Sequence, residues 1–328
     1  MFSSSQLVVG VDLGGRRIIK KKIKRTDKAY SIVTIGSAVL PEGAVDDGAL
    51  VEPEVVASAI SNLFKNLKIK HKKVGISISG YSVIVKKVNL AVMSEKDMED
   101  HIMAEAEQYI PFDIQDVYLD FQDLKTNKDG YERTDVMLVA AKKEIVDDYL
   151  SMLESIGLQT TIVDIDGFAL ENTYEYNTPK SENVALIDIG ASKMNINIIS
   201  KGMSVVARDI VVGSRQLTER IMGQFDLQFE EIFSSVCTQW ILEIKKAIDL
   251  YHSNFPDAPL TRLVLSGGGS KVAGLTDYLN QETGIEVERF NPFTNMKSSK
   301  RKIDPEYLQL IGPEMAIASG IAIRPSAI

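Results

Sequence analysis

Apolar residues recur at two spacings along the chain, and the change between these spacings predicts strands that alternate with helices. Short runs with an apolar residue at almost every position are typical of strands buried on both faces of a sheet. Such runs occupy residues 6–13, 74–79, 184–187 and 260–265. Longer segments have apolar residues three or four positions apart, the spacing of an amphipathic helix. These segments are 53–67, 214–225 and 229–251. The whole pattern predicts an α/β fold.

One strand-turn-strand pattern lies at the middle of the chain, in residues 184–199. An apolar strand leads to Asp188 and then to a turn of small residues. The turn contains Gly190, Ala191 and Ser192, and an alternating second strand follows it. Two strands joined by a tight turn form a β-hairpin. Small turn residues leave backbone N–H groups open to an anion, and a neighbouring carboxylate can hold a hydrated metal ion.

The same pattern occurs at the start of the chain, in residues 7–23. A strand ends at Asp12, the turn contains Gly14 and Gly15, and a second strand follows. A chain that carries this hairpin twice is expected to contain two related halves that face one phosphate chain. Residues 178–183, which include a proline, mark the expected boundary between these halves.

Two further segments are rich in small residues. Gly267, Gly268 and Gly269 follow the strand at 260–265 and precede a predicted helix. Such a turn allows a flat or anionic ligand to approach the backbone closely. The last predicted helix, 312–323, has small residues that permit close contact with another helix.

Residues 83–160 break the pattern of the first half. They predict the order β-α-β-β-α-β, which is typical of a small two-layer α+β module. We interpret this segment as an insertion. The two aspartates that follow it, Asp164 and Asp166, could position a water molecule, although the cap of a helix N-terminus is the simpler role.

Composition narrows the function classes. A chain of 328 residues is long enough for two domains, and 45% hydrophobic and 25% charged residues are typical of a globular protein. The net charge of −8 argues against a general nucleic-acid binder. The single cysteine, Cys237, fits a reducing compartment. We expect no signal peptide, and no apolar run reaches the roughly 20 residues that span a bilayer. The basic segment 16–25 could bind phospholipid or nucleic acid, but a solvated strand edge explains it more simply.

Four motifs in order resemble the actin-like ATPase superfamily. They are Asp12-Leu13-Gly14, Asp188-Ile189-Gly190, Ser266-Gly267-Gly268-Gly269 and the small-residue helix at 316–322. The resemblance implies two similar domains that hold ATP and magnesium between them. Asp12 and Asp188 would face the metal through water. The turns with Gly14, Gly15, Gly190, Ala191 and Ser192 would hold the phosphates, and Gly267, Gly268 and Gly269 would line the adenosine.

Other segments resemble one branch of that superfamily, the PilM family of type IV pilus assembly. They are 105–112, 213–219, 243–251 and Asn291-Pro292-Phe293, and the most specific piece is Tyr109-Ile110-Pro111-Phe112. The resemblance implies an actin-like fold with an inserted subdomain of the 1C type. The implied parts are subdomain 1A at 1–82 (completed by 161–182 and 312–328), 1C at 83–160, 2A at 183–213 and 260–311, and a short helical 2B at 214–259.

The resemblance to this family also implies partners. The cytoplasmic N-terminal peptide of the inner-membrane protein PilN would bind between subdomains 1A and 1C. Other pilus assembly proteins would also be partners. The chain would then work in the cytoplasm, peripheral to the inner membrane through its partner and without inserting into it.

Two departures from the family pattern concern the nucleotide. Arg16 and Arg17 follow the first turn where relatives carry small hydroxyl residues. An arginine there could pair with phosphate or fill the site. The Ala-Glu-x-x-Lys element that reaches the ribose in relatives is missing, with Glu230 and Glu231 as remnants. Both departures remove contacts with the nucleotide, so ATP binding stays open. If ATP binds, we expect weak or no hydrolysis, because no strong water-activating residue is visible. Two alternative functions are a small-molecule kinase of the sugar-kinase type and a filament protein like FtsA.

Overall fold

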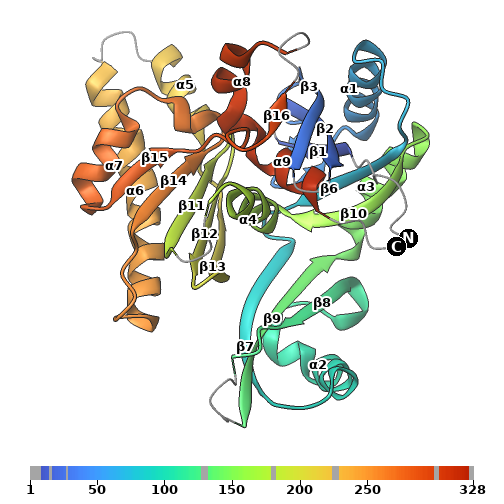
Figure 1. Ribbon diagram of the computed structural model, residues 1–328, viewed down its shortest axis with the longest axis vertical. Coiled ribbons are helices and arrows are strands. Elements are labelled where there is room, and N and C mark those ends of the chain that lie inside the picture. Colours follow the sequence, from blue (N-terminus) through green and yellow to red (C-terminus); the bar gives the residue numbers. More distant parts are fainter. Residues whose placement is uncertain are drawn as a thin grey trace.

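Two α/β halves lie side by side, and a smaller module projects from the first of them (Figure 1). The computed structural model describes residues 9–14, 17–26, 29–126, 132–178, 182–223, 229–298 and 303–324. The predicted site residue Gly15 and its neighbour Arg16 lie outside these ranges.

The first half is built on a six-stranded sheet with the order β10-β6-β1-β2-β3-β16. Its strands are β1 (Val9–Leu13), β2 (Arg17–Thr26), β3 (Ala29–Val39), β6 (Lys73–Ile78), β10 (Gln159–Ile165) and β16 (Lys297–Ser298). β1 and β2 form the predicted antiparallel hairpin, and β6 pairs with β1 in parallel. After β3 in the sequence, β4 (Val45–Asp46) and β5 (Ala49–Leu50) form a separate antiparallel pair.

The second half repeats this arrangement. Its five-stranded sheet has the order β13-β12-β11-β14-β15. The strands are β11 (Val184–Ile189), β12 (Met194–Ser200), β13 (Met203–Ile210), β14 (Arg262–Ser266) and β15 (Glu286–Arg289). Strand for strand, this order matches β3-β2-β1-β6-β10 of the first sheet, with an antiparallel hairpin beside a parallel strand in both. The prediction of two related halves is confirmed.

Side-chain alternation places the two hairpin carboxylates in a central layer. In β1, Val9 and Val11 pack in a core with α1 (Pro53–Asn66) and α3 (Lys143–Ser155). In β11, Ala185 and Ile187 pack in a core with α6 (Phe229–Asn254) and α7 (Leu275–Thr283). Alternate positions point to the opposite face of a sheet. Asp12 and Asp188 therefore belong to the faces that meet α4 (Asp166–Asn177) and α9 (Ala316–Ile323), as Val184 and Leu186 do.

The two central helices touch each other very closely. A Cβ atom added to Gly320 on α9 would lie 1.6 Å from the carbonyl oxygen of Ala169 on α4, so only glycine fits there. This contact explains the small residues of the last helix. The turn η3 (Gly312–Met315) precedes α9, and α8 (Pro305–Ile311) precedes η3.

The projecting module is a three-stranded antiparallel sheet covered by one helix. The strand order is β7-β9-β8, with β7 (Val83–Ala91), β8 (Val117–Asp123) and β9 (Arg133–Lys142). α2 (Glu95–Tyr109) packs on this sheet through Met98 and Ile102, and η1 (Ile114–Asp116) follows. The last two elements of the predicted module lie elsewhere: β10 pairs with β6, and α3 packs in the core of the first half.

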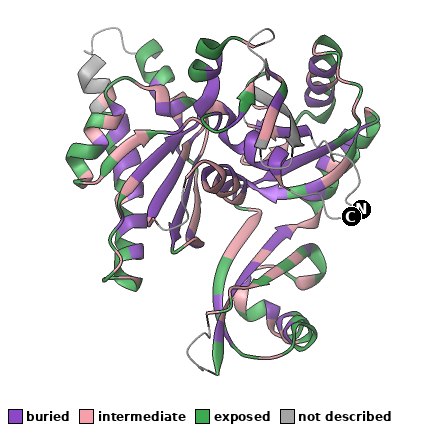
Figure 2. Ribbon diagram, in the orientation of Figure 1, coloured by how far each residue is buried: buried purple, intermediate pink, exposed green. Residues whose placement is uncertain are grey.

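Figure 2 shows that β1 and β6 of the first sheet and β11 and β12 of the second are largely buried, whereas much of the module is exposed. The helices α5 (Ser214–Gly223) and α6 cover the second sheet, and the turn η2 (Gly268–Lys271) connects β14 to α7. Among the described residues, no helix is both long enough and apolar enough to cross a membrane.

Candidate functional site

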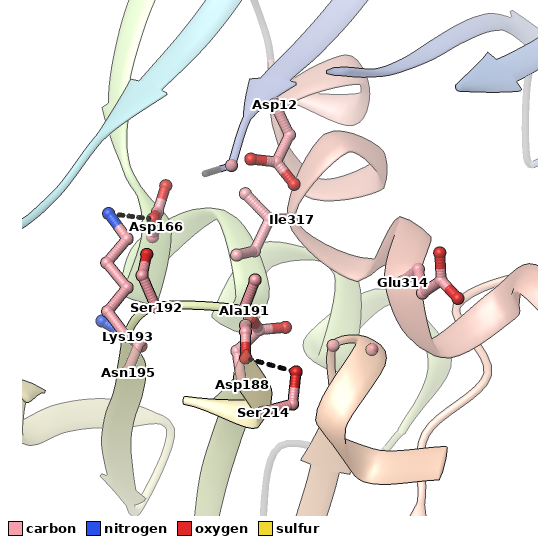
Figure 3. A pocket seen from close by; sticks show the side chains of 14 residues that line it. Asp12, Asp166, Asp188, Ala191, Ser192, Lys193, Asn195, Ser214, Glu314 and Ile317 are labelled. Carbon is pink, nitrogen blue, oxygen red and sulfur yellow. Dashed lines mark hydrogen bonds and ion pairs between the residues drawn. The ribbon is translucent and has the colours of Figure 1, made fainter. Parts of the chain in front are cut away.

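A cavity of about 280 Å³ lies where the two halves meet. Residues of both hairpins, of the glycine-rich turn and of the central helices line it. Figure 3 shows Asp12, from β1, and Asp188, from β11, on opposite sides of this cavity. The repeated fold explains this placement, because each carboxylate lies one residue before the end of the first strand of its hairpin, on the face toward α4 and α9.

A third carboxylate, Asp166, enters the cavity from the first residue of α4. The hydroxyl groups of Ser77 and Ser79 each donate a hydrogen bond to it at 2.5 Å. On the other side, the hydroxyl of Ser266 donates to Asp188 at 2.7 Å. These bonds fix the orientation of two of the three carboxylates.

One cation, Lys193, reaches these carboxylates from the turn of the second hairpin. Its Nζ lies 3.5 Å from Oδ2 of Asp166, and it also donates a hydrogen bond to the hydroxyl of Ser79. Burial lowers the pKa of an ammonium group, but the charges of Asp166, Asp209 and Asp12 outweigh it and raise the pKa of Lys193. Lys193 therefore stays protonated and bridges the two halves.

Burial and the neighbouring negative charges raise the pKa values of two of these aspartates. Burial first, and then the charges of Asp166 and Asp188, raise the pKa of Asp12 well above its usual value. Burial, with a smaller contribution from Asp166, raises the pKa of Asp188 to about 7. Such shifts mean that the carboxylates prefer protons, or another cation, to being charged alone.

The donor set fits a hydrated magnesium ion. Magnesium keeps several waters and uses one or two carboxylates together with phosphate oxygens. Among the residues that the structure describes, no group of three or more His, Cys, Asp and Glu side chains is placed to hold a metal ion directly. Asp12 and Asp188 supply the one or two carboxylates that a hydrated magnesium ion uses, and their contact with it through water stays a prediction.

Backbone contacts hold the turn of the second hairpin in place. The N–H of Gly190 donates to the carbonyl of Lys193 at 2.9 Å. At the start of α5, the N–H groups of Ser214 and Arg215 donate to the carbonyls of Gly190 and Ala191 at 3.0 and 2.8 Å. The turn is thus fixed against a helix N-terminus, a position that favours negative charge.

The three consecutive glycines have different surroundings. Gly267 has a φ of +80°, and a Cβ there would lie 2.4 Å from the carbonyl oxygen of Ile189. Gly268 has no atom within 4 Å of an added Cβ, so it faces open space. At Gly269 an added Cβ would lie 2.3 Å from the Cγ2 atom of Ile189. Gly267 and Gly268 line the cavity, whereas Gly269 is buried against a neighbouring strand.

Most of the residues expected at the site do meet in this cavity. They are Asp12, Gly14, Asp188, Gly190, Ala191, Ser192, Gly267 and Gly268. Gly269 is absent from the lining, and Gly15 is outside the described residues. The side chains of Arg17, Glu230 and Glu231 are outside the described part of the chain as well.

Sequence reasoning missed several lining residues. They are Lys193, Asn195, Ser214, Glu314 and Ile317. For Asp164 and Asp166 the sequence suggests either a water-positioning group or, more simply, a helix N-cap, and the N-cap prediction is wrong. The N-cap of α4 is Ile165, without a side-chain cap, and Asp164 instead pairs with Arg324. The available signal was the position of Asp166 at the carboxyl end of a parallel strand, where ligands of α/β sheets bind.

Comparisons with known proteins agree with this architecture. The sequence model of the family described as "Type IV pilus assembly protein PilM" matches residues 10–232 and 230–326. The structure titled "PilM-PilN type IV pilus biogenesis complex" is similar with a TM-score of 0.87 and 25% identity, over 97% of this chain and 99% of that chain. The ethanolamine utilization protein EutJ from Carboxydothermus hydrogenoformans has a similar fold, with a TM-score of 0.55 and 16% identity over 98% and 90% of the two chains.

These similarities confirm the predicted actin-like fold. They do not favour the kinase or the FtsA-like filament. The family match extends over both halves and the module, so the chain belongs to the PilM family of type IV pilus assembly proteins.

Proposed function

We propose that this chain is an adaptor that binds the cytoplasmic N-terminal peptide of PilN and so works at the inner membrane. The observation that carries the proposal is the similarity to a PilM-PilN complex over nearly the full length of both chains. The expected subdomains remain part of the proposal, with 1C narrowed to 83–142, because α3 and β10 pack with the first half. Contacts with other pilus assembly proteins would follow from the same role.

The junction between the module and the first half is the proposed place of the peptide. Tyr118 on β8 donates a hydrogen bond to Asp147 on α3 at 2.9 Å, and Nζ of Lys143 lies 5.7 Å from the centre of its ring. Nζ of Lys143 also donates to the carbonyl of Gln115 at 2.6 Å. The Tyr118 side chain is still 47% exposed. An exposed aromatic ring held by polar contacts is the kind of residue that dominates binding at interfaces.

Titration of a PilN N-terminal peptide by calorimetry tests this function. We expect binding to the unmodified chain and an affinity at least about tenfold weaker for Tyr118→Ala, the range of an interface residue of this type. Tyr307→Ala is the matched control, because Tyr307 on α8 is 42% exposed and lies outside the module and α3. Absence of binding heat at several temperatures, or equal loss in both variants, contradicts the proposal.

We further propose that the cavity between the halves binds ATP with magnesium. Asp12 and Asp188 would hold the hydrated ion, the turns with Gly14, Gly190, Ala191 and Ser192 would hold the phosphates, and Gly267 and Gly268 would lie against the adenosine. The raised pKa values of both aspartates and the open space at Gly268 support this assignment. Binding rather than rapid hydrolysis is the proposed use, because phosphoryl transfer needs a group that positions water. Asp166, the nearest candidate, is already bonded to Ser77 and Ser79.

A further inference from the structure

A second cavity, of about 390 Å³, lies in the first half, away from the cleft. The end of α1, the loop before β6 and the turn between α3 and β10 form it. Its floor is apolar, with Phe64 and Leu158 buried and Ile69 and Ile156 partly exposed. Since α1 and α3 cover the face of the first sheet that is opposite to α4 and α9, this cavity opens on the outer side of the molecule. We call this cavity the lysine pocket.

Four lysines surround that floor: Lys65, Lys68, Lys70 and Lys72, all exposed. Within the described part of the chain, none of them forms an ion pair. The nine residues 65–73 contain five lysines and no acidic residue, although the chain as a whole has a net charge of −8. The charge of this face is therefore positive, whereas the charge of the chain as a whole is negative.

The backbone holds one of these lysines in a costly conformation. Lys68 has a φ of +51°, in the left-handed region that favours glycine. It follows α1 in a Schellman motif, in which the N–H of Ile69 donates to Phe64 at 3.0 Å and the N–H of Lys68 donates to Lys65 at 2.9 Å. Glycine is the usual residue at this position, so a Lys68→Gly substitution removes the charge without straining the backbone.

We propose that the lysine pocket is a contact site for the headgroups of anionic phospholipids on a membrane surface. Clusters of four to eight basic residues are typical of surfaces that bind such lipids. Lysine is a hydrated point charge without the fixed fork of arginine, so an all-lysine rim suits many loosely ordered phosphates better than one planar carboxylate. The apolar floor accommodates the uncharged part of a headgroup, and the negative remainder of the surface turns this face toward the lipid. Neither the nucleotide nor PilN takes part.

Sedimentation of the full chain with vesicles tests the inference. We expect binding to vesicles of phosphatidylcholine with phosphatidylglycerol, little binding to pure phosphatidylcholine, and weaker binding as salt rises, because exposed charges are screened. Lys68→Gly should weaken vesicle binding about fivefold, the contribution of one lysine near an anionic surface. Its denaturant midpoint should not fall, because glycine suits the left-handed backbone better.

Lys201→Gly is the matched control. Lys201 is also exposed and left-handed, with a φ of +53°, but it lies in the turn between β12 and β13 of the second half. The same charge is removed in the same backbone conformation, so vesicle binding should stay unchanged. Equal binding by Lys68→Gly and the unmodified chain overturns the inference, as does equal binding to both kinds of vesicle. Displacement by soluble glycerol phosphate at the lipid phosphate concentration overturns it too, because the pocket would then hold a free anion. The vesicle assay contains no PilN. A negative vesicle result therefore contradicts lipid binding alone, and a negative PilN titration contradicts the proposed function alone.

Discussion

Replacement of Asp188 by asparagine should stabilise the protein when no ligand is bound. The pKa of about 7, against an ordinary value of 3.8, corresponds to about 4 kcal/mol at 1.36 kcal/mol per unit. Because burial is the main cause and Asp188 is partly exposed, we expect about half of this to be realised. Asparagine carries no charge, and its side-chain oxygen can still accept the hydrogen bond from Ser266.

The pH dependence has a definite sign. The folded state binds the Asp188 proton more tightly than the unfolded state, so this group stabilises the fold below about pH 4. That stabilisation is lost as the pH rises from there to about 7, the pKa of the folded state. The Asp188→Asn variant cannot ionise at this position, so it keeps the stabilisation at high pH. The gain of Asp188→Asn should therefore be small at pH 5 and largest at pH 8.

Denaturant unfolding at pH 5 and pH 8, with a chelator and without nucleotide, measures this gain. Asp249→Asn is the control, because Asp249 lies exposed on α6 and its replacement should change stability by less than about 0.5 kcal/mol at either pH. A loss of stability in Asp188→Asn at pH 8, or the same change at both pH values, would refute the reasoning. It would mean that the ligand-free cavity already stabilises the charged carboxylate.

Three further predictions concern the cavity and the glycine-rich turn beside it. Gly268→Ala should leave the unfolding midpoint unchanged and weaken ATP binding measured by calorimetry, because its Cβ enters open space in the cavity. Gly269→Ala should instead lower stability by roughly 1–3 kcal/mol, because its Cβ meets Ile189 and overpacks the core. Lys193→Gln should cost about 3 kcal/mol at pH 8, since Asp166 loses the cation beside it. The cost should be smaller at pH 5, because the raised pKa values of Asp12 and Asp188 let these two carboxylates take up protons there. An equal cost at both pH values would exclude Lys193 as their counter-ion.

The features of the site that depend on local sequence could be predicted. Asp12 and Asp188 each follow a short apolar strand and precede small residues, so local pattern alone indicated the two hairpins and the carboxylates beside their turns. Lys193 could not be found in this way. Its partner Ser79 is 114 residues away in the sequence, and a lysine in a turn ordinarily faces solvent. Only the meeting of the two halves gives it buried partners.

The limits of the module show a second boundary of sequence reasoning. The period of side chains identifies a strand, but it does not say which strand will pair with it. The last strand of the predicted module, expected at 159–164, is observed as β10 (Gln159–Ile165). Its partner is β6 of the first sheet, however, rather than a strand of the module. The choice depends on long-range packing: Tyr149 and Leu153 of the preceding helix are buried against the first sheet and carry β10 to its edge.

The cavity and the module share a structural connection that affects how variants must be compared. Lys193 donates to Ser79, and Asp209 accepts a hydrogen bond from the N–H of Gly80 at 2.6 Å. Both contacts fix the residues that lead directly into β7 of the module. A weaker PilN affinity in Lys193→Gln would therefore not measure nucleotide dependence, because the substitution also frees the entry to the module. Gly268→Ala touches neither contact, so it is the variant that separates nucleotide binding from the position of the module.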